Sequence, residues 1–190
     1  MNTTIYFVRH GQTDANKARI FSGQIDTPLN NTGREQVLET CKQIQKLSIK
    51  WDIIISSTLS RAYETAQIIN QYFPINVDII KDHSAIERSF GEAEGIPITD
   101  ENYRKIMNCE FKNEESEEEI INRAQNFIHK ILNTYPGKNV LVVTHSHFLK
   151  GCFKPYLPSL RFDTKTVNAG LSRLIFDQNQ QCITVDLLMK

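Results

Sequence analysis

Short apolar runs alternate along the chain with longer segments whose apolar residues recur at helical spacing. The runs Ile5–Val8, Ile53–Ile55 and Val140–Val143 are continuous, as expected of strands that are buried on both faces. A further short strand is expected near Val77–Ile80. Strands that alternate with helices form parallel sheets through right-handed crossovers, so the pattern predicts an α/β fold. We expect a three-layer sandwich with a mostly parallel central sheet and helices on both faces.

Two helices are predicted in the first half of the chain from their starting residues and apolar spacing. Thr32 and Glu35 have the spacing of a capping box, and the helix after them runs to about Leu47. Ser60 can cap a second helix. Pro74 ends that helix, because proline disfavours a helical conformation at the residue before it.

The second half of the chain carries the clearest helix and an antiparallel hairpin. Ser116 opens the helix with Glu119 at capping-box spacing, and the apolar stripe stops before Pro136. Leu171–Phe176 and Ile183–Leu188 flank a polar turn and predict a hairpin. We place this hairpin at an antiparallel edge of the sheet.

Residues 82–115 lack a clean period and contain a long polar stretch. We interpret this segment as an insertion or a lid, because long irregular segments within compact domains are commonly functional. The 190 residues, of which 40% are hydrophobic and 23% charged, have the composition of an ordinary globular protein. We predict that residues 1–190 form a single domain that carries this insertion.

The charge balance argues against a polyanionic or membrane partner. The chain has 22 Lys and Arg residues and 22 Asp and Glu residues, so its formal net charge is zero. A neutral protein has no bulk attraction to nucleic acid or to an anionic membrane. The longest aliphatic run, Val140–Val143, is far shorter than the roughly 20 apolar residues that span a bilayer. We therefore expect neither nucleic acid nor a membrane as a partner.

The cysteines and the N-terminus predict a cytoplasmic protein. The cysteines are widely spaced, form no C-x-x-C pair, and indicate reduced thiols rather than disulfides or a zinc site. They are Cys41, Cys109, Cys152 and Cys182. The N-terminus has no basic segment or small-residue cleavage site, so we do not expect export.

Two arginines and two histidines follow separate predicted strands at the points where these strands end. Arg9 and His10 follow the first strand. Arg61 begins the helix after the second strand, and His145 follows the fourth. In an open α/β sheet, ligands bind beyond the carboxyl ends of the strands. One Arg-His pair alone is more often structural, but a cluster of cations on a neutral chain requires an anion. The pattern therefore predicts a site for phosphate or carboxylate.

The remaining histidines do not indicate a metal site. His145 and His147 are one residue apart, but alternate residues of a strand point to opposite faces, and no carboxylate or thiol stands at ligand spacing from them. We expect His147 to pack in a helix or to support the site from behind. His83 and His129 are expected at the surface.

Six sequence motifs occur in order along most of the chain. They cover residues 6–16, which include Arg9-His10-Gly11, and residues 21–33, 56–66, 87–95, 142–145 and 168–172. In this combination the chain resembles the histidine phosphatase superfamily, in its phosphoglycerate mutase-like branch. Arg-His-Gly alone is a weak signal, whereas the ordered set is highly specific.

The resemblance implies a role for each of five residues. His10 would be the nucleophile that attacks phosphorus and forms a phosphohistidine. Arg9, Arg61 and His145 would hold the phosphate oxygens and stabilise the transition state. Glu87 would protonate the leaving oxygen and then accept a proton from the attacking water. The family mechanism implies neither a metal ion nor an organic cofactor.

Four further residues are expected to contact the phosphate or the rest of the substrate, and they are Asn16, Ser22, Gly23 and Ser146. Two positions depart from the family pattern. Relatives often have glycine at the position of Ser146, and serine there adds a hydrogen-bond donor or narrows the pocket. Ala93 stands where many relatives have tryptophan, which would open that wall of the site.

Three functions are consistent with the resemblance. We favour a metal-independent phosphatase that hydrolyses small phosphomonoesters. A phosphoglycerate mutase is the alternative, and it requires a phosphohistidine that survives until it phosphorylates the product. Because the chain ends at Lys190, shortly after its last predicted strand, we expect no tail to shield the intermediate from water. A non-catalytic phospho-ligand binding domain is disfavoured, because all reacting groups are present.

The expected partner is a small phosphorylated metabolite. The resemblance admits sugar phosphates, phosphoserine, phosphoglycerates, nucleoside monophosphates and ribazole phosphate. Residues 96–115 and 150–161 are expected to shape the rim of the pocket. The sequence carries no signal that fixes an oligomeric state.

Overall fold

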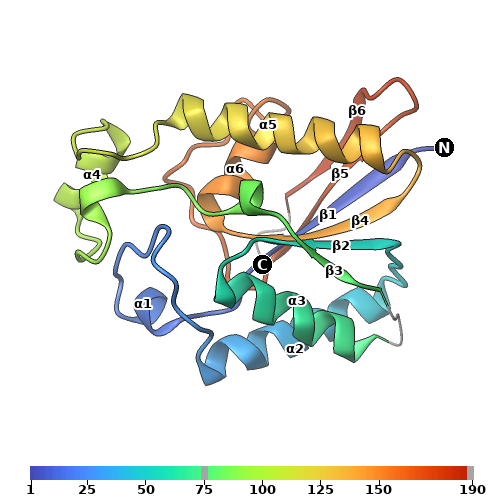
Figure 1. Cartoon of the computed structure of the whole chain (residues 1–190), viewed down its shortest axis with the longest axis horizontal. Helices are drawn as coiled ribbons and strands as arrows, with labels where there is room; N and C mark the ends of the chain where they lie inside the picture. Colours follow the sequence, from blue (N-terminus) through green and yellow to red (C-terminus); the bar gives the residue numbers. More distant parts are fainter. Residues whose placement is uncertain (74–76, 188–190) are drawn as a thin grey trace.

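The computed structural model describes residues 1–73 and 77–187, and within these residues six strands form one mixed sheet (Figure 1). The strands are β1 (Thr3–Arg9), β2 (Ile53–Ser56), β3 (Ile79–Lys81), β4 (Asn139–Thr144), β5 (Leu171–Phe176) and β6 (Cys182–Asp186). Their order across the sheet is β3-β2-β4-β1-β5-β6. The strands from β3 to β1 are parallel, whereas β5 and β6 are antiparallel to their neighbours. A mostly parallel sheet with an antiparallel edge is therefore confirmed.

Helices cover both faces of this sheet, as predicted. The helices are α1 (Asp14–Lys17), α2 (Asn31–Lys46), α3 (Ser60–Tyr72), α4 (Asp100–Met107), α5 (Glu117–Thr134) and α6 (Ser146–Phe153), with short 3₁₀ turns η1 (His83–Ala85) and η2 (Gly91–Ala93). Figure 1 shows α5 and α6 on one side of the sheet and α2 and α3 on the other. The three layers of the predicted sandwich are thus present.

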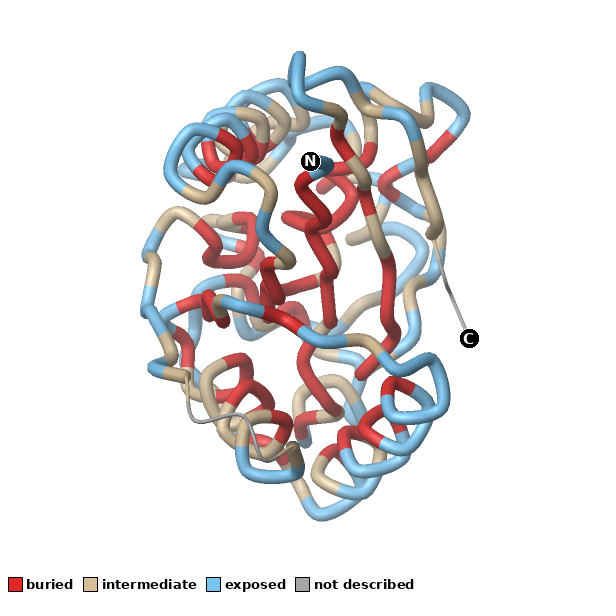
Figure 2. Tube along the Cα trace, turned by 90° about the vertical axis from the view of Figure 1, so that its right-hand side faces the viewer, coloured by how far each residue is buried: buried red, intermediate tan, exposed pale blue. Residues whose placement is uncertain are grey.

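Successive side chains of the central strands enter two separate cores. Ile5 and Phe7 pack with α5 and α6, whereas Tyr6 and Val8 pack with α2 and α3. The alternation arises because neighbouring side chains of a strand point to opposite faces of the sheet. Figure 2 shows the buried residues concentrated along the central strands. Burial on both faces explains why the apolar runs of the sequence are continuous.

Two of the predicted helix caps are wrong. The side chain of Asn30, and not that of Thr32, caps α2 by accepting a hydrogen bond from the backbone of Gly33. Ser60 is the first residue of α3 rather than its cap. The carboxylate of Asp26 instead accepts hydrogen bonds of 2.8 Å from both the backbone N–H and the hydroxyl of Ser60. The acceptor at the start of α3 therefore comes from a loop remote in sequence, and not from the Ser60 side chain that was predicted as the cap.

The start of α5 follows the prediction. Ser116 accepts a hydrogen bond from the backbone of Glu119, and the Glu119 carboxylate accepts one from the backbone of Ser116, which completes the capping box. The predicted helix end at Pro74 and the hairpin end at Leu188 lie outside the described residues. None of the described helices is long and apolar enough to cross a membrane.

Residues 82–115 contain structure that the apolar pattern did not predict. The helix α4 and a third apolar cluster organise this segment, and the cluster consists of Phe21, Phe90, Ala93 and Ile106. Gly91 has a φ of +54°, and a Cβ there would lie 2.0 Å from the carbonyl oxygen of Lys112, so this turn requires glycine. Ala93 is fully buried in the cluster and does not line the site, so the expected opening at this position is wrong.

Candidate active site

A cavity of about 710 Å³ lies at the carboxyl ends of the central strands. Eight of the nine residues singled out from the sequence line it, namely Arg9, His10, Asn16, Ser22, Gly23, Arg61, Glu87 and Ser146. The ninth, His145, is fully buried, and its ring centre lies 5.1 Å from that of His10. The fold thus gathers side chains from distant parts of the chain around one cavity.

The pairing of β1 with β4 sets the two imidazoles beside each other. Arg9 pairs with Thr144, so His10 and His145 each follow a paired residue. The backbone N–H of His10 donates to the carbonyl of Thr144 at 2.9 Å and extends the ladder by one step. The positions of the two histidines therefore follow from the register of the parallel strands.

The His10 ring presents one nitrogen with a free lone pair. Its Nδ1 lies 2.7 Å from the carbonyl oxygen of Gly11. Because a carbonyl can only accept, this contact places a proton on Nδ1 and leaves the lone pair on Nε2 of the neutral ring. Burial, and then the charges of Arg61 and Arg9, hold the pKa of His10 well below its ordinary value of 6.5. The ring is therefore neutral at pH 7.

His145 is oriented by a serine from the neighbouring strand end. Its Nε2 lies 2.8 Å from the hydroxyl of Ser57, which also accepts a hydrogen bond from the backbone of Leu59. Its buried Nδ1 has no hydrogen-bond partner among the described residues. Burial, and then the charges of Arg61 and His10, hold the pKa of His145 well below 6.5. A bound anion would favour the protonated ring.

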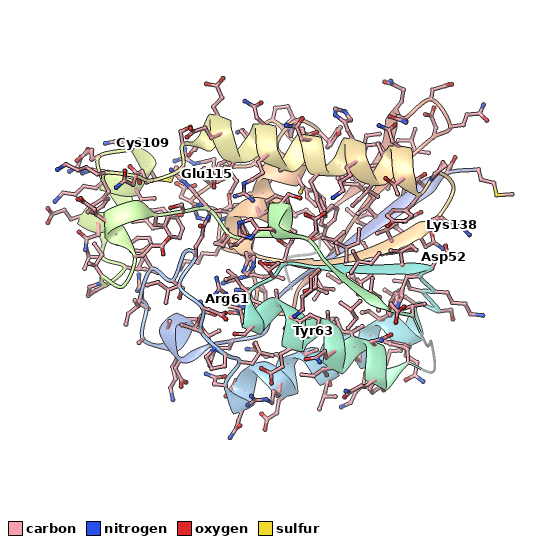
Figure 3. All side chains as sticks on the ribbon, in the orientation of Figure 1. Asp52, Arg61, Tyr63, Cys109, Glu115 and Lys138 are labelled. Carbon is pink, nitrogen blue, oxygen red and sulfur yellow. The ribbon has the colours of Figure 1, made fainter. Side chains whose placement is uncertain are left out.

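Two guanidiniums are fixed by backbone carbonyls. Arg61, at the start of α3 (Figure 3), donates to the carbonyls of Ile25 and Gly23 at 2.9 and 2.7 Å. Arg9 donates to the carbonyl and the hydroxyl of Thr166 at 2.6 and 3.2 Å. The Nε atoms of both arginines are buried without a partner in the part of the chain that the structure describes. Burial lowers the pKa of Arg9 to about 10, so it stays charged at pH 7.

The carboxylate of Glu87 is fixed at the start of α6. Its Oε1 accepts hydrogen bonds from the backbone N–H groups of Arg88, His147 and Phe148 at 2.9, 3.0 and 3.2 Å. Its Oε2 lies 3.3 Å from the N–H of His147 and retains capacity for a further hydrogen bond. The three amides thus position Glu87 at the cavity wall and leave Oε2 as the oxygen available for proton exchange.

Arg123 of α5 forms hydrogen bonds with the backbone of the segment that carries Glu87. Its Nη1 donates to the carbonyls of Ser84 and Ile86 at 2.9 and 2.8 Å, and its Nη2 lies 3.3 Å from the carbonyl of Glu87. The carboxylate of Glu115, which Figure 3 shows where the chain enters α5, accepts from Nε and Nη2 of Arg123 at 2.8 and 2.7 Å. The backbone around Glu87 is therefore attached to the helix behind it.

The other residues singled out from the sequence contribute polar groups at the cavity wall. The Ser146 hydroxyl lies 2.7 Å from the hydroxyl of Thr166. The amide oxygen of Asn16 accepts a hydrogen bond of 3.2 Å from the side chain of Asn168. The Ser22 hydroxyl is buried and has no partner within residues 1–73 and 77–187.

The buried groups without partners have the chemistry of an oxyanion site. Arg9, Arg61 and Ser22 line the cavity, and each has a buried donor that no described residue satisfies. Leaving a buried donor unsatisfied costs about 1–3 kcal/mol, so a ligand that accepts hydrogen bonds is expected there. Among the residues that the structure describes, no group of three or more His, Cys, Asp or Glu side chains is placed to hold a metal ion. The donors present suit a phosphate.

Sequence reasoning missed residues that support this site. The Thr65 hydroxyl accepts from the backbone N–H of Gly11 and donates to the carbonyl of Arg61, so it joins α3 to the end of β1. Thr65 lies four residues after Arg61 on the same helix, and that spacing was an available signal. Thr166, which anchors Arg9, lies in a segment without periodicity, and Tyr103 lines the cavity from the unpredicted α4.

Comparison with known proteins assigns the chain to a family. The profile of the histidine phosphatase superfamily (branch 1) matches residues 5–185. The chain therefore belongs to this superfamily. It is 37% identical over 181 residues to a Bacillus subtilis protein named uncharacterized phosphatase PhoE, and the match covers 94% of this chain and 91% of that protein.

Solved structures share the fold along nearly the whole chain. A phosphoglycerate mutase from Bacillus anthracis superposes with a TM-score of 0.85 at 22% identity, covering 98% of this chain and 92% of that one. A phosphoserine phosphatase from Entamoeba histolytica, in complex with phosphoserine, gives 0.80 at 23% identity and covers 97% and 96%. These likenesses establish the fold, which phosphatases and mutases share.

Proposed function

We propose that this protein is a phosphatase that hydrolyses small phosphomonoesters through a phosphohistidine at His10, without a metal ion in the reaction. The observation that carries the proposal is the state of His10: a neutral ring with a free Nε2 lone pair, beside His145 and in one cavity with Arg9, Arg61 and Glu87. Membership of the superfamily and the name of the 37% identical relative support hydrolysis of a phosphate ester.

In the first step, Nε2 of His10 attacks phosphorus in line with the leaving oxygen. The N–P bond forms while the P–O bond of the ester breaks, and Glu87 in its protonated form gives its proton to the leaving oxygen. The alcohol departs, and the phosphoryl group stays on His10. We assign the proton to Oε2 of Glu87, because three backbone amides occupy Oε1.

In the second step, water attacks the phosphorus of the phosphohistidine. The carboxylate of Glu87 takes a proton from this water as the O–P bond forms and the N–P bond breaks. Inorganic phosphate leaves, His10 returns to its neutral form, and Glu87 is again protonated. One carboxyl group therefore serves as acid and then as base, and the enzyme ends the cycle as it began.

The cationic side chains stabilise the phosphoryl group during transfer. Arg9 and Arg61 stay in place through their bonds to backbone carbonyls, and the buried Nδ1 of His145, which has no partner among the described residues, is the nitrogen we assign to the phosphate. Preorganised donors of this kind supply much of the catalysis of phosphoryl transfer. Four further groups, from Asn16, Ser22, Gly23 and Ser146, complete the contacts to the phosphate and the adjoining part of the substrate.

The proposal is tested with an aryl phosphate in the presence of a chelator. We expect the purified protein to release phosphate from p-nitrophenyl phosphate in excess EDTA, and His10→Ala to lose this activity. The exposed His129 provides a matched control, so His129→Ala should retain it. Acid quench with ³²P-labelled substrate should trap label on His10. Full activity of His10→Ala, or label on another residue, refutes the assignment.

Mutase activity is separated from hydrolysis in one further assay. The protein is incubated with 3-phosphoglycerate and a bisphosphoglycerate primer, and both isomerised product and free phosphate are measured. We expect phosphate release to exceed isomerisation. Isomerisation without phosphate release would assign the protein to the mutases instead.

We also propose that the protein acts in the cytoplasm on a small phosphorylated metabolite. The four cysteines are free in the structure, which supports a reducing compartment. We retain a single domain over residues 1–190, with residues 82–115 as an inserted lid. The helix α4 of this segment supports the lid role, because Asp100, Tyr103 and Arg104 line the cavity.

A further inference from the structure

The cavity carries more positive charge than one phosphate group requires. Seven cationic side chains line it against three carboxylates, although the whole chain is neutral. The cations are Arg9, Arg19, Arg61, Arg104, Lys150, Arg161 and Lys165, and the carboxylates are Glu87, Asp100 and Asp163. A phosphate monoester brings a charge of about −1.5 to −2 near pH 7. Positive charge therefore remains for a second anionic group.

Lys150 is a buried cation that the mechanism leaves unexplained, whereas Arg19 and Lys165 are exposed. It lies in α6, is only 3% exposed, and donates to the carbonyl of Phe162 at 2.6 Å. Within the described parts of the chain it forms no ion pair, whereas Arg104 pairs with Glu110 and Arg161 with Asp163. Lysine is almost never fully buried without a partner, because an unpaired buried charge is costly. Two of its three N–H groups remain available to a ligand.

His147 lies three residues before Lys150 on the same helix, so the two side chains are neighbours on its surface. The ring is 5% exposed, lines the cavity, and stands between the rings of Phe90 and Phe162, with centres 5.2 and 5.5 Å away. Its buried Nδ1 meets no hydrogen-bond partner among residues 1–73 and 77–187. A buried imidazole nitrogen at a cavity wall that nothing satisfies is a second, independent sign of a ligand.

The position of His147 locates this part of the cavity relative to the reaction. Its backbone N–H donates to the carboxylate of Glu87, the group assigned to protonate the leaving oxygen. Its side chain therefore begins next to the leaving group and not at the distal rim. We therefore assign a ligand group that meets His147 and Lys150 to the organic part of the substrate.

We propose that Lys150 and His147 form a second anion subsite, which binds a carboxylate on the organic part of the phosphomonoester. The donors match this group: two N–H groups of an ammonium and one imidazole suffice for two planar oxygens, whereas a second phosphate offers three. The inference rests on the proposed phosphatase function and names its substrate class, the small phosphorylated carboxylic acids.

The test uses two substrates that differ in one group. In 3-phosphoglycerate a carboxylate stands where glycerol 3-phosphate has a hydroxymethyl group. We expect kcat/KM for 3-phosphoglycerate to exceed that for glycerol 3-phosphate by about tenfold or more. A hydrogen bond between two charged groups is strong enough to produce a ratio of this size. Fructose 1,6-bisphosphate is the third substrate, and it tests whether the subsite binds a second phosphate instead of a carboxylate. A preference for the bisphosphate over 3-phosphoglycerate overturns the carboxylate assignment.

The variants test which residues produce the selectivity. Lys150→Met should bring the ratio of the two kcat/KM values close to one, and Lys150→Arg should restore much of it. Lys154→Met is the matched control, because Lys154 also donates to loop carbonyls, those of Pro158 and Leu160, but does not line the cavity. We expect Lys154→Met to keep the ratio of the unmodified protein. Equal ratios in Lys150→Met and the unmodified protein contradict the inference.

A second variant covers the case in which Lys150→Met does not fold. His147→Phe removes the imidazole nitrogens and keeps an aromatic ring between its two neighbours, so it should also reduce the ratio. Unchanged selectivity in this variant excludes His147 from the subsite. Hydrolysis of p-nitrophenyl phosphate by the unmodified protein, without any preference for 3-phosphoglycerate, overturns the subsite but leaves the phosphatase function standing. Absence of aryl phosphate hydrolysis instead removes the phosphatase function itself.

Discussion

At the scale of single residues, the placement of Glu87 suits the two steps that we propose for its carboxyl group. Backbone N–H groups of α6 hold one oxygen, so the side chain does not need to reorient between the departure of the alcohol and the arrival of water. The reacting oxygen stays at the cavity wall throughout. Proton transfer by a positioned group of this kind contributes about 10²–10⁴-fold to a rate.

Glu87→Gln should therefore separate substrates by their leaving groups. Glutamine keeps an acceptor for the α6 amides but cannot give a proton, so esters with basic leaving groups should slow by about 10²–10⁴-fold. The ester p-nitrophenyl phosphate, whose leaving group needs little protonation, should slow much less in its first step. The measurement compares kcat/KM for phenyl phosphate and p-nitrophenyl phosphate. Equal slowing of both substrates contradicts the acid role.

Residues differ in how far the sequence alone could place them. Arg9, His10 and His145 follow apolar strands, and the rule that strand ends meet at one edge was enough to bring them together. Glu87 lies in a segment without periodicity, and only the family resemblance pointed to it. The burial of Lys150 could not be predicted, because a lysine in a short apolar helix is normally expected to reach solvent.

At the scale of elements, α5 supports the site without contributing to its surface. Arg123 crosses from α5 to the segment before Glu87 and binds its backbone carbonyls, while Glu115 balances its charge. The network joins α5, a helix that the sequence pattern predicted clearly, to the segment before Glu87, whose structure the pattern did not predict. In the proposed mechanism, Arg123 is therefore a positioning residue, which acts on the reaction through Glu87.

Arg123→Met should lower both stability and the efficiency of proton transfer. It leaves the carbonyls and the Glu115 carboxylate without their donor, and losing the hydrogen bonds of this partly buried network costs about 1–3 kcal/mol. Urea denaturation measures the stability change. Activity should fall more for phenyl phosphate than for p-nitrophenyl phosphate, because Glu87 is displaced. A stability loss with equal slowing of both substrates would show that Arg123 is merely structural.

The elements also show where local signals succeed and where context decides. The capping box at Ser116 is complete within four residues, and the structure confirms it. At α2, Asn30 and Thr32 are both good caps, and the local chain path selects the earlier one. The helix α4 has eight residues and few apolar positions, so its period is too short to recognise, and contacts with Phe21 and Phe90 stabilise it instead.

At the scale of the whole molecule, the site places several uncharged imidazoles in the interior. His10, His145 and His147 are all buried, and burial is the main cause that holds each pKa well below 6.5. Below pH 6.5 the unfolded chain binds protons at these positions that the folded protein does not bind. Stability is therefore greatest above pH 6.5 on their account and is lost as the pH falls toward their lowered pKa values.

The free energy of unfolding should consequently decrease as the pH is lowered from 6.5 to 5.5. Each such histidine contributes a slope of up to about 1.4 kcal/mol per pH unit. Urea denaturation at several pH values measures this slope. His147→Gln should make this slope smaller, because the unfolded chain then loses one of the groups that bind protons only in the unfolded state. A free energy of unfolding that stays constant over this interval contradicts the buried neutral state of these rings.

The register of β1 against β4 has a consequence for how such an enzyme can change. Neighbouring strands of any sheet lie about 4.8 Å apart, and the imidazoles that follow this strand pair have centres 5.1 Å apart. The strand spacing thus sets the distance between the two imidazoles. That spacing is a property of the peptide backbone and not of any side chain. Segments such as residues 96–115 can be exchanged to suit a new substrate while the distance between the rings of His10 and His145 stays the same.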